Sequence, residues 1–351
     1  MYHPPVLAHA ARLGGASLLA AALASAVSLD SAPRKAAFAV EVQPVPLNPV
    51  NPAQASVGRL AYRGGLWLRS TDPRFGGLSD LRVAPNRESF QAISDCGAVF
   101  EAGLAYDGRG FLAGLVEPRL DGLLAPGGRP LRKGEVDAEA MARDGPDGFV
   151  VAFEGRHHLW RYPGPAGLHG TPSPMSAPSG LAQCDSNAGI EAMTRLPDGR
   201  LLLIAEGEPG RPRASMGWVG HDAEWSSFSY PLVYDPRVPR EPFHPTAATC
   251  LPGSDDVLVL ERRYPPVAAR IRRVGRAAFE RGTGLDGVEV ARLDPPLTLD
   301  NYEGIDAVVG PQGETLLYVV SDDNNCAKTP GGSSPHSLQR TLLLMFELSE
   351  P

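Results

Sequence analysis

The sequence predicts an all-β protein, folded as a β-propeller of five or six four-stranded antiparallel blades whose ring is closed by the N- and C-terminal strands. Three observations support this prediction. A strand–turn–strand unit recurs along the chain. The 351 residues include 39 glycines and 35 prolines, as expected for many short strands joined by turns. Strand-like segments also lie at both ends of the predicted domain, and long helical patterns are scarce.

The recurring unit begins with a small or acidic residue and a half-apolar strand, passes through a turn rich in Pro, Asp, Asn and Gly, and ends in a strongly apolar strand. The intervals between successive starts are 62, 52, 55 and 58 residues. Such spacing suits propeller blades, whose repeats are often about 40–50 residues, with each unit supplying the two strands nearest the axis. The units span 75–95, 137–154, 189–206, 244–261 and 302–322.

The strands farther from the axis are expected between these units. HHLWRY at 157–162, RIRRV at 270–274 and VARL at 290–293 show the partial period-2 alternation of half-buried strands. The segment AAFERGTGL at 277–285 is expected to form a short helical turn or a loop. The stretch 163–178 is rich in Pro, Gly and Ser, which indicates an extended loop.

The two ends of the predicted domain offer a way to close the ring. TLLLMFEL at 341–348 is a strong strand, and GRLAYRGGLWLRS at 58–70 has a strand pattern. Pairing between them would complete one blade and remove a free sheet edge. The pattern leaves open whether these strands complete a fifth blade or build a sixth.

The N-terminus has the features of an export signal. Residues 13–27 are apolar and follow Arg12, and residues 24–26 (Ala-Ser-Ala) supply the small side chains that a signal peptidase requires. We therefore expect cleavage near Ala26, with an uncleaved anchor as the alternative. No later stretch is long and apolar enough to span a membrane as a helix.

The chain is accordingly expected to contain three segments, which are a signal peptide at 1–26, an N-terminal extension at 27–57 and the propeller domain at 58–351. The mature protein is expected to be monomeric and periplasmic or secreted. A formal net charge of −7 argues against nucleic acid or an anionic membrane as a partner. We expect a small-molecule ester or phosphate ligand and no stable membrane insertion.

Acidic residues recur at matching positions of the units, each of which ends in Asp or Glu. In a propeller such positions converge at one mouth of the central channel, where carboxylates repel one another unless a cation lies among them. Oxygen ligands in such number suit Ca²⁺. The predicted metal ligands are Asp95, Glu139, Glu191, Glu206, Glu303, Asp322 and Asp323.

A wider set of acids is expected to converge at the same mouth, and it adds Asp137, Glu154, Glu261 and Asp300. The alternative is that these acids pair with arginines and backbone amides, or that calcium braces the ring without taking part in chemistry. Asp300, Glu303 and Asp306 open what otherwise looks like a buried apolar strand, where an unpaired carboxylate is costly.

The predicted catalytic residues are Glu154, Arg156, His157 and Arg262. An arginine fork suits a phosphate or a carboxylate, and a histidine can serve as an acid or a base. For Arg262 the alternative is an Arg–Glu ion pair inside the ring. For His157 the alternative is a structural hydrogen bond.

Four cysteines allow up to two disulfides in an oxidising compartment. Cys184 and Cys326 both lie in polar, Gly- and Asn-rich contexts, which favours a bridge between these two. Cys250, in TAATCLPG, is interpreted as a small buried hydrophobe. None of the four, which include Cys96, shows the CxxC spacing of a zinc site.

Several motifs carry a family resemblance, and they are FGGLSDL, AISDCG, DAEAMA, FEGRHHLWRY, NAGIEAM, LPDGRLLLIAE, VLERRYPP, DNYEGIDA, SDDNN and TLLLMFEL. As an ordered set, from about Gly65 to Leu348, they resemble the phytase-like family, described as having esterase-like activity of phytase. The resemblance implies a β-propeller exported by bacteria and loosely related to calcium-dependent phytases.

Two positions depart from the family pattern. Residues 94–97 are Ser-Asp-Cys-Gly where the family often has Ser-Asp-Arg-Gly. Residues 153–155 are Phe-Glu-Gly where Phe-Glu-Arg is common, with Arg156 one place later. Both departures weaken a phosphate-binding set.

Two functions follow as hypotheses. The first is an exported, calcium-dependent hydrolase of a phosphate ester or a related ester. The second is a non-catalytic, ligand-binding propeller with structural calcium, favoured by the missing basic positions. A serine esterase is not supported, because GLSDL at 77–81 lacks the second glycine of a G-x-S-x-G nucleophile elbow.

Overall fold

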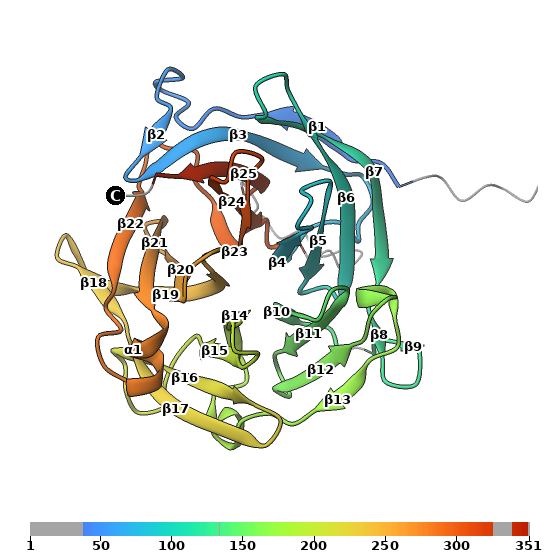
Figure 1. Cartoon of the computed structure of the whole chain (residues 1–351), viewed down its shortest axis with the longest axis vertical. Helices are drawn as coiled ribbons and strands as arrows, with labels where there is room; N and C mark the ends of the chain where they lie inside the picture. The colour runs from blue at the N-terminus through green and yellow to red at the C-terminus, as the bar shows by residue number, and fades with distance from the viewer. Residues whose placement is uncertain (1–37, 133, 326–338, 350–351) are drawn as a thin grey trace, which may run out of the picture. The chain divides into compact units, whose positions relative to one another are not determined.

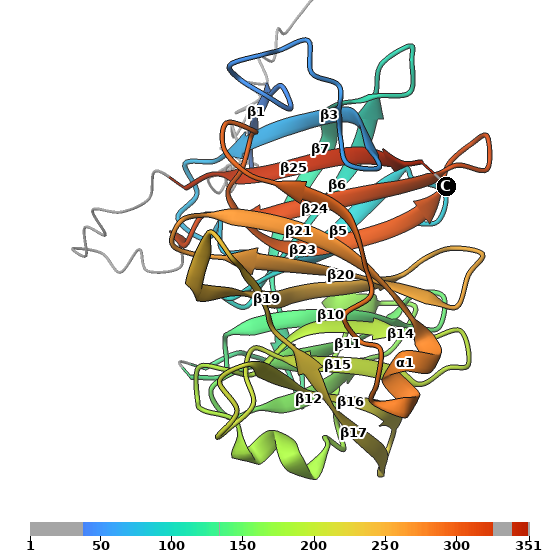
Figure 2. The same ribbon diagram turned by 90° about the vertical axis from the view of Figure 1, so that its left-hand side faces the viewer.

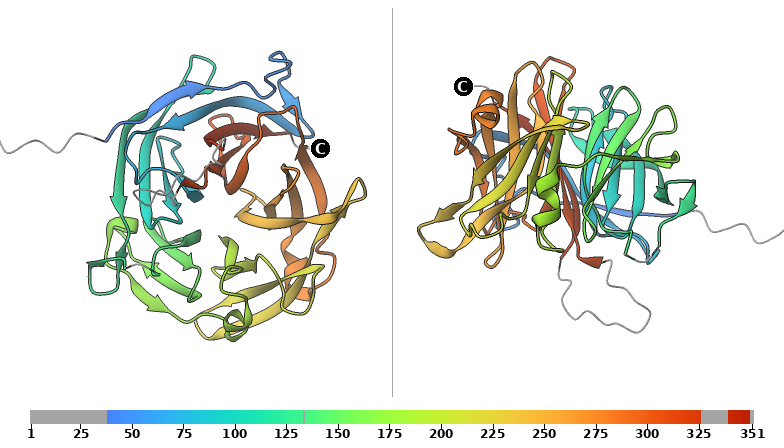
Figure 3. Two further views of the ribbon diagram at one scale, coloured as in Figure 1. Left: turned by 180° about the vertical axis from the view of Figure 1, so that it is seen from behind. Right: turned by 90° about the horizontal axis from the view of Figure 1, so that it is seen from below.

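Five antiparallel sheets of four or more strands surround a central axis in the computed structural model, which describes residues 38–132, 134–325 and 339–349 (Figure 1). The innermost strands of all five sheets surround the same central space, which is visible when the ring is viewed from the front and from behind (Figures 1 and 3). The predicted all-β propeller is therefore confirmed, and the open choice between five and six blades is settled at five.

The first three blades follow one another along the chain, each with its innermost strand first. Blade 1 contains β4 (Leu78–Val83), β5 (Ser89–Ser94), β6 (Ala98–Tyr106) and β7 (Leu112–Gly122). Blade 2 contains β10 (Ala138–Asp144), β11 (Gly148–Phe153), β12 (His158–Tyr162) and β13 (Ser173–Met175). Blade 3 contains β14 (Ile190–Arg195), β15 (Leu201–Ala205), β16 (Ala214–His221) and β17 (Glu224–Pro231).

Blade 4 is larger and contains β18 (Val233–Asp235), β19 (Val238–Cys250), β20 (Asp256–Arg263), β21 (Ala268–Gly275) and β22 (Val288–Leu293). The predicted helical turn in this region is the helix α1 (Arg276–Arg281). The other small elements are the ribbon β8 (Leu124–Ala125) with β9 (Arg129–Pro130), and the 3₁₀ turns η1 (Gly167–His169) and η2 (Ser179–Gln183).

Blade 5 joins the two ends of the described chain. Its order from the axis is β23 (Asn301–Val309), β24 (Thr315–Asp322), β25 (Thr341–Leu348), β3 (Leu60–Arg69) and β1 (Glu41–Pro44), with β2 (Ser56–Val57) also paired to β3. The strands β25 and β3 run antiparallel side by side (Figure 2). The predicted closure by terminal strands is therefore present, and it removes a free sheet edge.

Two parts of the sequence-based outline need correction or comment. The stretch 163–178 was expected to be an extended loop, but it contains β13, the outer strand of blade 2. The strand β1 belongs to the segment expected to be an N-terminal extension, and it forms the outer edge of blade 5. The predicted signal peptide lies outside the described residues. Within the described ranges, no helix has both the length and the apolar character that a bilayer crossing requires.

The hydrophobic core of the described chain is divided into five clusters, each lying between two neighbouring blades. Because both faces of a blade are covered by its neighbours, its middle strands are apolar on both sides. The strand β15, with the sequence LLLIA, is buried at every position. This explains why the second strand of each repeat is an almost continuous apolar run rather than an alternating one.

The innermost strand pair of every blade carries a register shift at the same place. Each shift leaves one extra residue on the innermost strand, as in a β-bulge, which bends a strand and redirects a side chain. The five bulge residues are Ser79, Glu139, Glu191, Thr246 and Glu303. The five repeats therefore share one β-bulge at the same position as well as the same strand arrangement.

The axis of the ring is filled by a buried arginine, Arg82 on β4, whose side chain is 3% exposed. Its guanidinium donates hydrogen bonds to one main-chain carbonyl of each blade, and these belong to Leu81, Met141, Met193, Ala248 and Ile305. Asp80 balances the charge, with its Oδ1 atom 2.7 Å from Nη1 of Arg82. One side chain thus ties all five innermost strands together.

Candidate functional site

The bulges place two rings of side chains at one mouth of the channel. The bulge ring consists of the five bulge residues named above. On the second strand of each blade, one residue pairs with the residue that directly precedes the bulge. The strand-end ring consists of the next residue along the chain in each blade, namely Asp95, Glu154, Glu206, Arg262 and Asp322. Four blades therefore contribute a carboxylate to the strand-end ring, and blade 4 contributes an arginine.

The structure corrects the alignment of the fourth repeat by one residue. Glu261 pairs with Pro245 in the ladder position that Phe153 and Ala205 occupy in their blades, so Glu261 is not a member of the strand-end ring. Its fully buried carboxylate accepts hydrogen bonds from Arg270, Arg272 and Tyr230 within blades 3 and 4. The prediction that Glu261 converges with the other acids is wrong, because a shift of one residue on a strand reverses the face of a side chain.

The remaining acids of the two rings act on one another electrostatically. Burial and then the charges of Asp322 and Asp137 raise the pKa of Asp95 to about 8. Burial and then the charge of Glu191 raise the pKa of Glu139 well above its usual value. The charges of Glu154, Glu191, Glu206 and Glu303 interact in the same way around the ring. All seven predicted metal ligands therefore lie in one connected electrostatic group, since Asp323 acts on Asp95 and Asp322.

The tightest part of this group is formed by Asp137, Glu139 and Glu154 of blade 2. Each offers one carboxylate oxygen, and the three oxygens lie within 4.8 Å of one another. Asp137 holds a left-handed backbone (φ 79°), as Gly77 does at the equivalent position of blade 1 (φ 62°). A non-glycine residue in this conformation is uncommon and points to a local requirement for its side chain. Asp137 belonged to the wider predicted set but not to the predicted ligands.

The donor set of this cluster fits a hard divalent cation. All three donors are carboxylates, and Ca²⁺ prefers oxygen ligands. No residue in the described ranges donates a hydrogen bond to the carboxylate of Glu139, although burial opposes its ionisation. One oxygen of Glu154 accepts a hydrogen bond from the main-chain N–H of Gly189 at 2.9 Å, which fixes the direction of its carboxylate.

Arg262 occupies the position that carboxylates occupy in the other four blades. Its Nη2 atom lies 3.1 Å from Oε1 of Glu303, so the alternative expectation of an ion pair inside the ring is realised. Among the groups that raise the pKa of Arg262, Glu303 comes first and Glu206 second. Its Nε atom is buried and has no hydrogen-bond partner among the described residues.

Of the other predicted catalytic residues, His157 places its side chain beside that of Glu154. Arg156 contacts the main chain of Glu154, with its main-chain N atom 2.8 Å from the carbonyl oxygen. A Cβ atom added to Gly189 would lie 3.0 Å from Nδ1 of His157 and 3.1 Å from Cγ of Glu154, so one glycine touches both side chains. The Nε2 atom of His157 is 2.9 Å from the carbonyl oxygen of Asp185. Arg156 is exposed and forms no ion pair within the described part of the chain.

The acids that open β23 do not all reach the mouth. Asp300 accepts from Arg340, with Oδ2 3.1 Å from Nε of the arginine, so its predicted place among the converging acids is wrong. Asp306 lies farther along the strand and accepts from the main-chain N–H of Val83 at 2.8 Å and from Thr249 at 3.1 Å. Only Glu303, at the bulge, turns toward the mouth.

The cysteines also differ from expectation. Cys184 is a free thiol, so the predicted bridge between Cys184 and Cys326 is wrong. Cys96 takes part in a disulfide. Cys250 is free and partly buried, with its Sγ atom 3.1 Å from the carbonyl oxygen of Arg195, and burial raises the pKa of its thiol to about 11.

The fold and the site together define a five-bladed propeller with an acidic mouth that a single arginine interrupts. The family model described as “Phytase-like: Esterase-like activity of phytase” matches residues 73–325. The chain belongs to this phytase-like family, as the resemblance of its motifs implied.

Other comparisons add little to this assignment. No curated protein matches the chain significantly. Among solved structures, “Structure of U3-55K” is 8% identical, with a TM-score of 0.40 over 80% of this chain and 98% of that chain. “Crystal structure of RRP9 WD40 repeats” is 7% identical, with a TM-score of 0.40 over 84% and 100%. A protein of unknown function from Bacteroides caccae is 13% identical, with a TM-score of 0.30 over 70% and 65%.

Proposed function

We propose that the chain is an exported, calcium-dependent hydrolase that acts on a phosphate ester or a related ester at the acidic mouth. The observation that supports this most is the strand-end ring. Blades 1, 2, 3 and 5 each place a carboxylate there, and blade 4 places Arg262 at the equivalent position. Such crowding of like charges is unfavourable without a cation, and an arginine beside it suits an anionic group of a substrate. Membership of the phytase-like family supports the same reaction class.

The calcium ligands that the geometry favours are Asp137 and Glu139, whose carboxylate oxygens lie within 4.8 Å of each other and of one oxygen of Glu154. The predicted ligands Asp95, Glu191, Glu206, Glu303, Asp322 and Asp323 complete the acidic wall around them and are assigned to further ligation or to holding bound water. When bound, the cation would polarise an ester oxygen and lower the pKa of a bound water.

The side chains of the mouth have distinct proposed roles. Glu154 is fixed by the N–H of Gly189 and is assigned as the base that takes a proton from the attacking water. His157 lies next to it and is assigned to hold that proton, through the Nδ1 atom that has no described partner. Arg262 is assigned to bind the anionic end of the substrate, in exchange for part of its contact with Glu303. Arg156, exposed at the edge, is assigned to an outer anionic group.

A second candidate function is a non-catalytic, ligand-binding propeller in which calcium has a structural role. The contact between Arg262 and Glu303 favours it, because the arginine is already neutralised within the ring. The absence of a nucleophile elbow in the sequence is compatible with both candidates.

The test uses the full chain freed of metal by a chelator and then supplied with Ca²⁺ or Mg²⁺. We expect calcium-dependent hydrolysis of p-nitrophenyl phosphate or p-nitrophenyl acetate. The variant Glu139→Gln should lose at least about tenfold in calcium affinity, because one ligand charge is removed. The matched control is Glu289→Gln on the exposed side of β22, which should retain both affinity and activity. Calcium binding without hydrolysis would favour the binding propeller, and no calcium binding would contradict both candidates.

The remaining features of the proposal concern the state of the protein. We propose a periplasmic or secreted monomer that acts on a small molecule and engages neither nucleic acid nor a membrane. The support is the export pattern near Ala26 and the net charge of −7. N-terminal sequencing of the exported chain is expected to begin at Val27, and a full-length N-terminus would contradict cleavage.

A further inference from the structure

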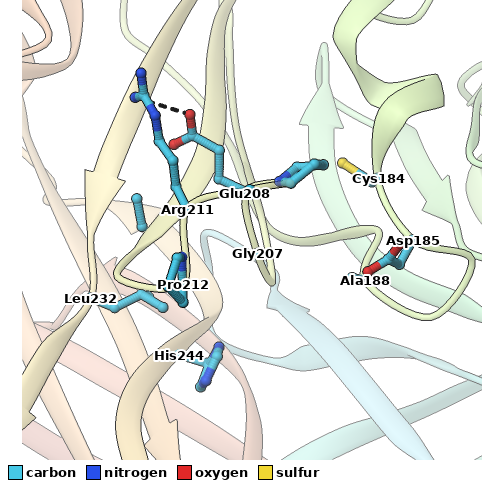
Figure 4. Close-up of a pocket in the computed structure, with 12 residues that line it drawn as sticks. Cys184, Asp185, Ala188, Gly207, Glu208, Arg211, Pro212, Leu232 and His244 are labelled. Carbon is cyan, nitrogen blue, oxygen red and sulfur yellow. Dashed lines mark ion pairs between the residues drawn. The ribbon is translucent and has the colours of Figure 1, made fainter.

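A groove leads from the acidic mouth outward over blade 3. Its inner part is a cavity of about 400 Å³ whose lining includes Cys184, Gly207 and His244 (Figure 4). Gly207 directly follows Glu206 of the strand-end ring, and Nδ1 of His244 lies 3.0 Å from the carbonyl oxygen of Glu206. The inner cavity therefore lies next to the main chain of one residue of the strand-end ring.

The outer part of the groove is a second cavity of about 490 Å³, and it shares Glu208 and Arg211 with the inner one. It is lined by the outer strands of blade 3 and by residues of the turn η2. Trp218 on β16 pairs with Ser227 on β17, and strand alternation places Trp225 on the same face as Ser227. The outer cavity therefore combines the partly exposed indole of Trp225 with hydroxyl groups, whereas Trp218 is 2% exposed.

The groove carries no unbalanced positive charge. Apart from His244, Arg211 is the one basic residue among the described residues that line the groove. Its Nη1 atom lies 3.0 Å from Oε1 of Glu208. Glu208 also accepts a hydrogen bond from Ser229, and Asp185 adds a further negative charge to the inner cavity. A ligand with several phosphates would meet net repulsion here, because charge complementarity is absent.

The neutral polar groups fit a different kind of ligand. Ser227 and the amide of Gln183 each offer both donor and acceptor capacity, which matches the hydroxyl groups of a sugar ring. The hydroxyl of Ser229 already donates to Glu208 and offers acceptor capacity alone. Trp225 is partly exposed, and its indole offers a large apolar surface that suits the C–H face of a sugar. The indole N–H donates to the carbonyl oxygen of Asp222 at 2.9 Å, which fixes the direction of the ring. Ligand sites generally combine such apolar walls with a few polar groups that fix orientation.

We propose that this groove binds a neutral carbohydrate moiety of the substrate, so that the scissile bond is an ester of a sugar carrying no more than one anionic group. The place of the ester at the mouth rests on the proposed function, whereas the binding of the sugar in the groove does not. The sugar ring lies against Trp225 and Ser227, and the Glu208–Arg211 pair lies between the ring and the acidic mouth.

The first experiment measures sugar binding to the full chain in the presence of a chelator, so that no hydrolysis is needed. Saturation-transfer NMR with the methyl glycosides of glucose, galactose, mannose and N-acetylglucosamine is expected to show binding of at least one of them. The variant Ser227→Trp fills the groove and should reduce this binding at least tenfold. The matched control Ser226→Trp changes the exposed neighbour on the opposite face of β17 and should leave binding unchanged.

The second experiment separates this inference from the proposed function. Inositol hexakisphosphate is expected to bind the chelated chain at least tenfold more weakly than the best glycoside, and equal or tighter binding would overturn the inference. Absence of binding by all four glycosides, or equal binding by the two tryptophan variants, would also overturn it. If sugars bind and Ser227→Trp abolishes binding while no ester is hydrolysed, the groove assignment stands and the hydrolase proposal fails.

Discussion

Asp300, just before β23, and Glu303 and Asp306 within it show how position within a few residues decides the role of a carboxylate. Asp300 is neutralised by Arg340, Asp306 accepts hydrogen bonds from Val83 and Thr249, and only Glu303 faces the acidic mouth. The bulge at Glu303 is the cause, because it interrupts the regular alternation of the strand. A buried carboxylate costs free energy unless it is compensated, and each of these three has its own arginine partner, namely Arg340, Arg262 and Arg143.

The contact between Arg262 and Glu303 gives a prediction at the same scale. Replacing Arg262 with methionine leaves the surrounding acids without their nearest cation, so the metal-free protein should lose about 1–3 kcal/mol of stability, less than a fully buried pair because both side chains remain partly exposed. Chemical denaturation in a chelator at pH 8 measures this loss. Added Ca²⁺ should recover a larger share of stability in Arg262→Met than in the parent chain.

The control for this prediction is Arg63→Met, which removes the ion pair between Arg63 and Glu347 on blade 5. Both side chains of that pair are 30% exposed, so its removal should cost less than about 1 kcal/mol and should not depend on calcium. Equal losses in the two variants would show that Arg262 is an ordinary surface partner and that the acids of the mouth do not repel one another strongly.

At the scale of the element, the innermost strand carries most of the information in each blade. The bulge on this strand supplies one residue of the bulge ring. One main-chain carbonyl group farther along the strand accepts a hydrogen bond from Arg82. Five carbonyls that converge on an axis form a region of negative potential, which a single guanidinium with its several N–H donors can satisfy. The channel is thereby closed at this level by a side chain.

Replacement of Arg82 tests this arrangement. Arg82→Met removes hydrogen bonds to all five blades and leaves Asp80 buried without its cation, so we expect a loss of about 3–5 kcal/mol of unfolding free energy. Equilibrium denaturation by urea measures it. The double variant Asp80→Leu with Arg82→Met should be less destabilised than Arg82→Met alone, because no unpaired charge remains. A double variant as unstable as the sum of the two single ones would contradict the pairing.

The strands of the repeats were predictable because their apolar content and turn residues are local features. Three of the five innermost pairs lie wholly inside the predicted units, and the other two overlap their units. Acids of different blades, such as Asp95 and Asp322, act on one another as the repeat predicted. The sequence could not show that Arg262, and not Glu261, belongs to the strand-end ring. Only the pairing register of the two strands shows which of two adjacent charged residues faces the mouth. Arg82 was missed for a similar reason, since four of its five carbonyl partners lie on other blades. The strand β13 was missed because it is short and contains a proline.

At the scale of the whole molecule, ring closure connects local chemistry to global stability. The strands β25 and β3 come from opposite ends of the described chain, so blade 5 joins the beginning of the ring to its end. The acids of the mouth come from four blades, and their mutual repulsion acts across the interfaces between blades. Anything that neutralises the mouth should therefore stabilise the ring as a unit rather than one blade.

This connection predicts how the stability of the metal-free protein depends on pH. The pKa values of Asp95 and Glu303 are raised to about 8 and that of Asp322 to about 6, mainly by burial, so the folded chain binds more protons than the unfolded chain between about pH 4 and pH 8. Stability must then fall as the pH rises through this range, because the slope follows the protons bound by the unfolded state minus those bound by the folded state. We expect the melting temperature in a chelator to fall by at least about 5 °C from pH 5 to pH 8.

Calcium should reverse this trend, because a ligand that binds only the folded chain stabilises it by about 2.7 kcal/mol at a concentration of one hundred times its Kd. The gain should be largest at pH 8, where protons no longer compete for the carboxylates. Differential scanning calorimetry at pH 5 and pH 8, with calcium and with chelator, measures both effects, and Glu139→Gln should flatten the pH dependence. A metal-free protein that is most stable at pH 8 would show that the acids of the mouth are already compensated within the chain, and that the ring has no need of a cation.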